Sequence, residues 1–507
     1  MNESSSKLAQ ALTTLKSIQD NGHQVIRSNQ LSRTERETLI KYGFLRSIMR
    51  GWYAASQPDE KLGDSTPWYT CFWSFCAEYL DDRFGQQWAL SPEQSLALHI
   101  GDRTIPTQLL VRSPKATNNS IELPHKTSIL EVQLKLPEQA HLTTLNGLRV
   151  YTLAAALVYS SPKNYTQHPI QMRTALSMVS DASDILKVLI VGGHSAIAGR
   201  LAGAFRNIGR AIIADSIING MAANDYRVSE TDPFTDKILI DFGRRQLSPY
   251  SNRIRLMWSE MRNDVINLFP EPSTKPADIN NILEKIDEQF VSDAYHSLSI
   301  EGYRVTEELI ELIHSGKWDP NTSGESKKHL DAMAAKGYWN AFQKVKETIT
   351  SVLNGANPGE ALERVHGDWY LALFSPSVAA GIVSQQDLAG YRSGPVFIRN
   401  SMHTPPDKEA VRDMMPTFFD LLIEEESVAV RAVLGHFIFV FIHPYFDGNG
   451  RIGRFIMNLM LASGGYPWTV VPVEKRSDYM HALEAASVKQ NIKPFAEFLG
   501  RLVNTSD

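Results

Sequence analysis

Residues 443–454 read His-Pro-Tyr-Phe-Asp-Gly-Asn-Gly-Arg-Ile-Gly-Arg and gather the groups needed to move part of a nucleotide. A hydroxyl that attacks phosphorus must lose a proton. The neutral imidazole of His443 can accept it, and such a base accelerates a reaction by about 10²–10⁴-fold. Asp447 suits Mg²⁺, which takes one or two carboxylates together with phosphate oxygens. A lone histidine is usually structural and a lone Asp-Gly is usually a turn, but together in one short segment they predict an enzyme that acts on ATP.

The residues that follow Asp447 favour an anion site. Gly448 and Gly450 can adopt backbone angles that other residues avoid, and the next helix begins at about Gly450. The first amides of that helix lack partners, and such a nest of amides binds anions. Arg451 and Arg454 lie three residues apart on one helix face, so they can clamp neighbouring phosphates. The alternative for the arginine pair is an ordinary solvated surface.

These groups must be held by the segments on either side of them. Residues 428–441 are apolar nearly all round, which predicts a buried helix. Pro444 biases His443 away from helical geometry, so this helix ends there and the imidazole projects from a rigid end.

From residue 277 onward the sequence predicts an almost entirely helical unit. One extended piece, 395–399, interrupts it and is followed by the Pro405-Pro406 turn. Prolines at both ends of 270–276 predict a linker, and the polar stretch 316–326 predicts an exposed loop. The predicted helices are 277–301, 304–314, 327–353, 358–373, 408–425, 427–441, 450–463 and 476–501.

Composition sets outer limits on the protein class. With 507 residues, 43% of them hydrophobic, the chain is long enough for two to four domains. A net charge of −5 gives no reason to regard the whole chain as a nucleic-acid binder. Cys71 and Cys76 stand alone, so we expect buried thiols in a reducing cytosol. The N-terminus is polar and the apolar windows are short or charged. We therefore expect a cytoplasmic protein with no membrane partner.

The segment 443–454 resembles the signature of Fic-domain proteins, His-x-Phe-x-Asp/Glu-Gly-Asn-Gly-Arg-x-x-Arg, with Tyr445 in place of the usual Phe. The resemblance implies an all-helical core with a short β-hairpin flap. It also implies transfer of AMP from ATP–Mg²⁺ to a Ser, Thr or Tyr hydroxyl of a target protein, with pyrophosphate leaving. His443 would be the base, Asp447 would bind Mg²⁺ and Arg454 would hold the γ-phosphate. The groups implied to bind the α- and β-phosphates are Gly448, Asn449, Gly450 and Arg451.

Two further assignments follow from the same resemblance. Residues 391–406 resemble the family's flap, which registers the target by strand pairing, although an ordinary surface hairpin is the alternative. Tyr479 stands where related enzymes place an aromatic residue near adenine, whereas a tyrosine at helical spacing is also typical of a core. The predicted target-binding residues of the flap are Val396, Phe397, Ile398 and Met402.

The segment from Ser297 to Gly302 matches the family's inhibitory pattern, Ser/Thr-x-x-x-Glu-Gly/Asn, within a helix expected at about 288–302. Glu301 would end that helix and pair with Arg454, which would remove the γ-phosphate clamp. A charge-assisted pair that is partly buried is stronger than a surface pair. The following Gly302 allows the helix to end there. The sequence therefore predicts an enzyme restrained by its own Glu301.

The first 53 residues predict helices and a β-wing with surplus positive charge. Ser32 is the expected N-cap of a helix from Arg33 to Tyr42, and Gly43 stops it before a short hairpin. The segment holds eight Lys and Arg against four acids, a surplus of 8 − 4 = +4. This is the pattern of a winged-helix reader of operator DNA, with a solvated basic surface as the alternative.

The stretches Leu-Ile-Lys-Tyr-Gly-Phe-Leu-Arg-Ser-Ile-Met-Arg-Gly-Trp-Tyr and Leu-Ser-Pro-Glu-Gln-Ser-Leu-Ala-Leu-His resemble AbiEi-type antitoxins over roughly residues 5–160. The fold expected for the whole chain is mainly α, with winged-helix and α/β domains before the Fic domain. The predicted domains are a winged-helix-like domain at 1–58, an α/β antitoxin-like domain at 59–225, connecting helices and linker at 226–270, and the Fic domain at 271–507.

Other functions stay open at the level of sequence. The same site could transfer another phosphate-containing group, or it could remove AMP from proteins with Glu301 positioning water. The chain could instead be a DNA-binding regulator of the toxin–antitoxin type. A homodimer is compatible with the sequence, which does not define an oligomeric state.

Overall fold

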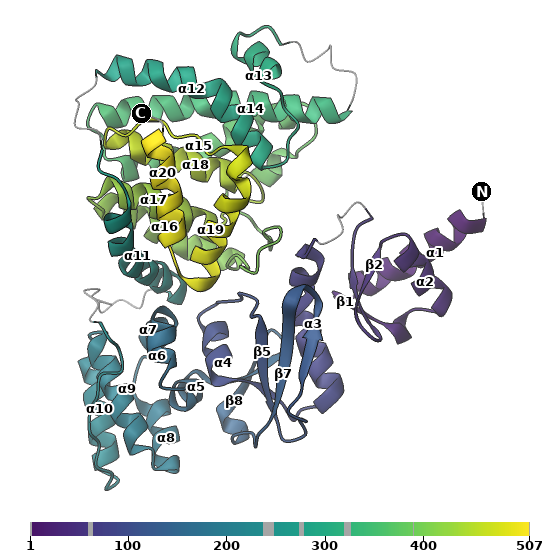
Figure 1. Ribbon diagram of the computed structural model, residues 1–507. Helices are drawn as coiled ribbons and strands as arrows, with labels where there is room; N and C mark the ends of the chain where they lie inside the picture. The colour runs from purple at the N-terminus through teal and green to yellow at the C-terminus, as the bar shows by residue number, and fades with distance from the viewer. Residues whose placement is uncertain are drawn as a thin grey trace. The chain divides into compact units, whose positions relative to one another are not determined.

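The computed structural model shows a mostly helical chain with three small sheets (Figure 1), which confirms the mainly α prediction. Clustering of contacts divides the chain into two compact units. The N-terminal unit comprises residues 1–249 and 397–404, and the C-terminal unit comprises 250–396 and 405–507. The structure describes residues 3–58, 64–236, 248–272, 278–318, 326–388 and 390–505.

The N-terminal unit begins with two helices and a small sheet of strand order β1-β3-β2. The predicted cap is present, because the Ser32 hydroxyl accepts from the amide of Glu35 and the Glu35 carboxylate accepts from the amide of Ser32. Gly43, at φ +79°, follows the end of this helix. These elements are α1 (Glu3–Asp20), β1 (Val25–Arg27), α2 (Arg33–Lys41), β2 (Leu45–Met49) and β3 (Trp52–Ala55).

The α/β part of the same unit contains a sheet of order β4-β5-β7-β6, in which β5 pairs parallel with β7. Side chains of β5 alternate between buried and more exposed positions, as expected for a half-buried strand. Its elements are α3 (Thr66–Phe84), β4 (Ala89–Leu90), α4 (Pro92–His99), β5 (Gln108–Ser113), β6 (Ser120–Leu123), β7 (Thr127–Gln133), β8 (Leu142–Leu145) and β9 (Leu148–Tyr151).

One hydrophobic core crosses the boundary predicted at residue 58. It joins Ile48 and Trp52 to Phe72, Phe75 and the strands that follow. Both cysteines lie in this core as free buried thiols, as predicted. Six short helices complete the unit: α5 (Leu153–Tyr159), α6 (Asn164–Gln167), α7 (Pro169–Ser177), α8 (Ser183–Gly192), α9 (Ser195–Asn207) and α10 (Ala211–Ala222).

The C-terminal unit contains only helices and loops among its described residues. The predicted helix 476–501 is in fact two helices, because Gln490 adopts a left-handed conformation (φ 52°) and ends the first of them. The helices are α11 (Pro249–Leu268), α12 (Ile279–Ile300), α13 (Glu307–His314), α14 (Ser326–Leu353), α15 (Pro358–Ala379), α16 (Lys408–Glu424), α17 (Val428–Ile442), α18 (Asn449–Ser463), α19 (Arg476–Lys489) and α20 (Lys493–Thr505).

The flap differs from the prediction. Residues 390–407 are all described and hold no strand, so the expected hairpin is an extended loop without a ladder of its own. Its outer part, 397–404, belongs to the N-terminal unit. Most of the predicted linker 270–276 and of the loop 316–326 lies outside the described residues.

Candidate functional site

A buried helix carries the proposed base. Ser427 caps α17, and the helix is apolar and buried along most of its length up to Ile442. His443 then adopts a left-handed conformation (φ 53°), which turns the chain out of the helix. Its Nδ1 lies 3.2 Å from the carbonyl oxygen of Val440. A carbonyl can only accept, so Nδ1 carries the proton in the neutral ring and Nε2 is the basic nitrogen. Burial lowers the pKa of His443 to about 4, which keeps the imidazole neutral near pH 7.

The loop after His443 leads directly into an anion-binding helix end. Gly448 takes φ 79°, and α18 begins at Asn449. The first amides of α18 have no partner within the helix, so they are available to an anion. Asp447 precedes this turn, and its side chain is 61% exposed. One carboxylate oxygen accepts from the amide of Gly448 at 2.6 Å and the other accepts from Arg451 at 3.1 Å.

Asn449 contributes differently from the expectation. Its side-chain oxygen accepts from the amide of Tyr445 at 3.0 Å, and its side-chain nitrogen donates to the carbonyl of Tyr445 at 2.8 Å. Both ends of the amide therefore help to close the loop on Tyr445. The ring of Tyr445 stacks on Tyr370 with centroids 3.8 Å apart and an interplanar angle of 10°, so it fills the slot that Phe usually fills.

Arg451 is buried beneath this loop. Its guanidinium pairs with Asp447 and lies over the rings of Tyr303 and Phe374, 5.3 and 5.0 Å from their centroids. Burial alone would lower its pKa, but Asp447 and other neighbours outweigh burial and the pKa of Arg451 is raised. The cation is thus held in a fixed position at the first turn of α18.

Arg454 is bound to the end of α12. It donates to the carboxylate of Glu301 at 2.7 Å, to the hydroxyl of Ser297 at 2.9 Å and to the carbonyl of Ser297 at 3.1 Å. The Arg454 side chain is 3% exposed and that of Glu301 is 26% exposed. Burial would lower the pKa of Arg454, but the charge of Glu301 outweighs it and raises that pKa. Gly302, at φ 94°, lets α12 end directly after Glu301.

The Glu301 carboxylate also covers the start of α18. A Cβ added at Gly450 would collide with Oε1 of Glu301, so the carboxylate packs against the backbone of the anion-binding turn. Glu301 and Arg454, which are 153 positions apart in the sequence, thus meet at the turn that begins α18.

Comparison with known proteins agrees with this geometry. Residues 372–461 match the family model described as Fic/DOC family. The chain carries a Fic domain. It is 30% identical over 220 residues to the protein adenylyltransferase Fic of Drosophila willistoni, covering 42% of this chain and 40% of that protein. The corresponding protein of Nematostella vectensis is 28% identical over 220 residues, covering 43% and 47%. The chain therefore spans less than half the length of these two curated relatives.

A solved structure of a fragment of Fic-1 from C. elegans is 18% identical, with a TM-score of 0.36, and covers 67% of this chain and 94% of that fragment. Helix α12 lies outside the matched segment 372–461 and outside the Fic signature. The contact between Glu301 and Arg454 is therefore an observation of this structure and does not follow from the family match.

No role could be assigned to Arg392 from the sequence, yet its side chain joins the flap segment 391–406 to the backbone of His443. It is 1% exposed and donates to the carbonyls of His443 (2.8 Å), Gly394 (3.0 Å) and Pro406. Its own amide donates to the carbonyl of Pro444 at 2.9 Å. Burial lowers the pKa of Arg392 to about 10, so it stays charged at neutral pH. The one indication of this role in the sequence is that Arg392 follows Tyr391 in the segment that resembles the flap.

Tyr479, which the resemblance placed near adenine, lies in a hydrophobic core in this structure. Tyr479 is 1% exposed, and its hydroxyl is 2.8 Å from Nε2 of His436. Its ring packs beside those of Phe495 and Phe498, with centroids 6.2 and 5.9 Å away. The residue belongs to the core between α17, α19 and α20.

The predicted flap residues are split between the two units. Val396 belongs to the C-terminal unit, whereas Phe397, Ile398 and Met402 belong to the N-terminal unit. Phe397 is 36% exposed, and Met402 packs against the core of the N-terminal unit.

A buried carboxyl on α12 should make the stability of the C-terminal unit depend on pH. Asp293 on α12 accepts from the hydroxyl of Tyr338 at 2.7 Å, and burial raises its pKa to about 6. Its pKa in the unfolded chain is about 3.9, so its stabilising effect is complete below about pH 4 and is lost as the pH rises through 6. Asp293→Asn should therefore gain about 2 kcal/mol relative to wild type between pH 4.5 and 7.5, measured by urea unfolding. A difference that stays constant with pH would contradict this.

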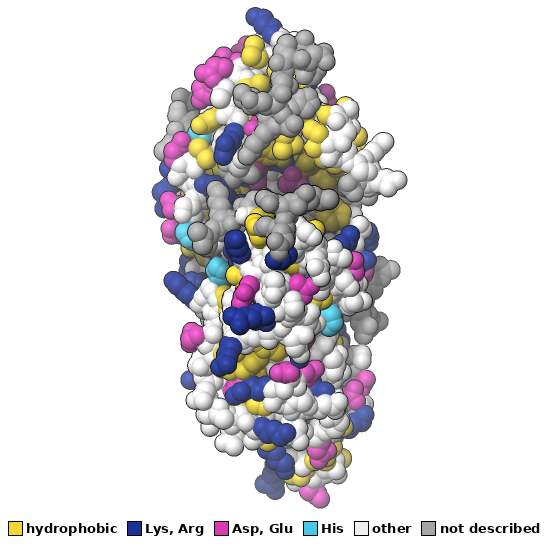
Figure 2. Space-filling model, turned by 90° about the vertical axis from the view of Figure 1, so that its right-hand side faces the viewer, with side chains coloured by type: hydrophobic (Ala, Val, Ile, Leu, Met, Phe, Trp, Pro, Cys, Tyr) yellow, Lys and Arg dark blue, Asp and Glu magenta, His cyan; other side chains and the backbone are white. Residues whose placement is uncertain are grey.

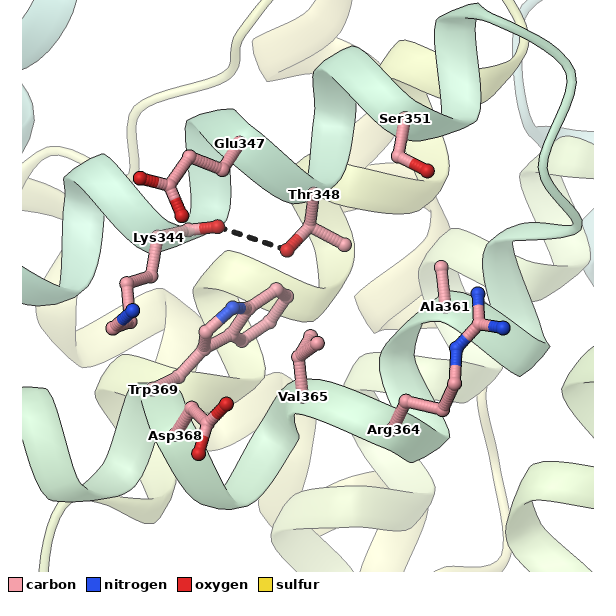
Figure 3. A pocket seen from close by; sticks show the side chains of 9 residues that line it. All are labelled: Lys344, Glu347, Thr348, Ser351, Ala361, Arg364, Val365, Asp368 and Trp369. Atoms are coloured by element: carbon pink, nitrogen blue, oxygen red, sulfur yellow. Dashed lines mark hydrogen bonds between the residues drawn. The ribbon is translucent and has the colours of Figure 1, made fainter.

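A second hollow lies between α14 and α15 (Figure 3), lined by Lys344, Glu347, Arg364, Asp368 and Trp369 among others. It includes no residue of 443–454 or 297–302. Among the described residues, no helix is long and apolar enough to cross a membrane.

Proposed function

We propose that this chain transfers AMP from ATP to a Ser, Thr or Tyr hydroxyl of a target protein. The observation that carries the proposal is the neutral His443, with Nε2 as its basic nitrogen, at the start of a loop that leads into the N-terminus of α18 and two buried arginines. The relatives in Drosophila willistoni and Nematostella vectensis are named protein adenylyltransferase Fic, which supports the same activity.

In this mechanism the target hydroxyl gives its proton to Nε2 of His443 while its oxygen attacks the α-phosphorus of ATP. The bond from the α-phosphorus to the bridging oxygen breaks, and pyrophosphate leaves. The first amides of α18 and the guanidinium of Arg451 stabilise the charge on the α- and β-phosphates. Once Glu301 is displaced, the guanidinium of Arg454 would be able to donate to a γ-phosphate oxygen.

Asp447 fits the way in which Mg²⁺ is held at nucleotide sites. No cluster of three or more His, Cys, Asp or Glu residues exists within the described parts of the chain, so a cage made only by the protein is not present there. A single exposed carboxylate beside a phosphate site matches Mg²⁺, which binds one or two carboxylates together with substrate phosphate oxygens. When bound, Mg²⁺ would neutralise charge on the phosphates and orient them.

Glu301 acts as a brake in this proposal. Its carboxylate pairs with the arginine that would hold the γ-phosphate, and it packs on the turn that would hold the other phosphates. ATP must displace this carboxylate to bind in the reactive pose. The support is geometric: the negative charge of Glu301 stands where a negatively charged phosphate is needed.

Mass spectrometry tests the transferred group. The Glu301→Gly variant, incubated with ATP and Mg²⁺, should add the mass of AMP to protein hydroxyls. Label from α-³²P-ATP should be incorporated and label from γ-³²P-ATP should not. Label from γ-³²P-ATP on protein would show phosphorylation instead and contradict the proposal. Release of AMP from a modified protein without any forward transfer would favour the reverse reaction.

DNA binding by residues 1–58 is a separate proposal, supported by the charge surplus of residues 1–53. The structure weakens it, because Arg27 pairs with Asp82, Arg33 pairs with Glu37, and Arg36 donates to the carbonyl of Ser28. On the face drawn in Figure 2, basic side chains stand among acidic and hydrophobic ones. A gel shift with promoter DNA and a steep dependence on salt would support operator binding. The homodimer likewise remains a prediction.

A further inference from the structure

The outer part of the flap is fastened to the N-terminal unit by several independent contacts. Arg399 pairs with Asp64 at 2.8 Å, and the Asp64 side chain is only 6% exposed. The side-chain oxygen of Asn400 accepts from the amide of Ser65 at 3.2 Å and from its hydroxyl at 3.3 Å. The amide of Asn400 donates to the hydroxyl of Thr66 at 3.4 Å. These contacts place the flap residues at the start of α3.

A second anchor lies further along the same segment. The amide of Ile105 donates to the carbonyl of Met402 at 2.9 Å, and the side chain of Met402 packs against the core of the N-terminal unit. Asn400 holds a left-handed conformation (φ 57°), which turns the chain between the two anchors. Since 390–407 has no ladder of its own, these contacts replace the internal pairing that would otherwise fix its shape.

We propose that the N-terminal unit sets the conformation of residues 397–404 and thereby determines which polypeptides the flap accepts. Asp64, Ser65 and Thr66 act here as positioning residues, because they hold the segment without touching the nucleotide site. This inference rests on the proposed function, since it takes Phe397, Ile398 and Met402 as target-binding residues. It deepens that function by assigning target selection to a part of the chain outside the Fic domain.

A first experiment tests whether Asp64 and Ser65 hold residues 397–404, without measuring enzymatic activity. Trypsin cleaves after Arg399 only when the segment opens locally. Asp64→Asn removes the charge that pairs with Arg399, and Asn400→Gly removes the bonds to Ser65 while tolerating the left-handed backbone. Each should raise the rate of cleavage after Arg399 by about fivefold.

The matched control is Asp82→Asn, which removes the ion pair with Arg27 in the same unit and touches no residue of 397–404. Its rate of cleavage after Arg399 should equal that of wild type. If Asp64→Asn and Asn400→Gly also cleave at the wild-type rate, the N-terminal unit does not hold the flap and the inference is overturned.

A second experiment measures which target proteins are modified. In the Glu301→Gly background, Asp64→Asn should lower AMP transfer to lysate proteins by about fivefold, or change which proteins are modified, with the Kd for ATP unchanged. The same proteins modified to the same extent would overturn the inference while leaving the proposed function intact. If Glu301→Gly alone transfers nothing, the proposed function fails, and the trypsin result still decides whether the flap is held.

Discussion

Replacing Glu301 by glycine should raise the rate of AMP transfer by about 10- to 100-fold. The Glu301–Arg454 pair is a charge-assisted hydrogen bond with one partner fully buried, and such bonds contribute about 1.5–3 kcal/mol. ATP binding in the reactive pose must break that bond, so its removal lowers the free energy needed to reach the transition state by a similar amount. The measurement is the initial rate of AMP incorporation at saturating Mg²⁺, together with the KM for ATP.

The control for this variant is Glu288→Gly. Glu288 is exposed on the same helix, α12, and its replacement carries a helix-propensity cost of about 1 kcal/mol without touching Arg454. Activation by Glu288→Gly would mean that general loosening of α12, and not the loss of one carboxylate, releases the enzyme. If neither variant is activated, Glu301 does not inhibit the enzyme.

Replacing His443 by alanine in the Glu301→Gly background should reduce AMP transfer by about 10²–10⁴-fold. Nε2 of His443 is the proposed proton acceptor, whereas His436 on the same helix is fully buried and its Nε2 lies 2.8 Å from the hydroxyl of Tyr479. The Kd for ATP should change little, since the phosphates are held by the amides and arginines of α18. The readouts are the rate of incorporation and the ATP affinity, measured separately.

His481→Ala is the matched control, because His481 is exposed on α19 and lies outside the catalytic loop. It should leave the rate unchanged. A His443→Ala variant that keeps the rate of its parent would show that another group accepts the proton. A variant that loses ATP binding as well as transfer would mean that His443 supports the loop instead of acting as a base.

Much of the site could be predicted because its residues are close together in sequence. The spacing from His443 to Arg454 fixes a helix end, a turn and a helix start, and local chemistry at such points depends on few other residues. The contact between Glu301 and Arg454 could also be predicted, since residues 297–302 match the inhibitory pattern of the family that the sequence resembles. The sequence did not reveal how the Asn449 side chain is used. In the structure it closes the loop by bonding the backbone of Tyr445.

The features that the sequence did not reveal have a common physical origin in long-range packing. Tyr479 lies on a helix whose periodicity does not reveal which neighbour covers it, and the covering residues come from α17 and α20. The break at Gln490 required a left-handed residue that was neither Gly nor Asn. The attachment of Arg399 to Asp64 joins residues more than 300 positions apart, and nothing in either local sequence indicates the other.

The three carbonyls bound by Arg392 have a consequence for protein engineering. One planar cation fixes both arms of the flap and the backbone of His443, and a lysine, with its compact point charge, could not reproduce that geometry. We therefore expect substitutions between Val396 and Met402 to leave the backbone of His443 in place, so this segment could be redesigned without moving the imidazole.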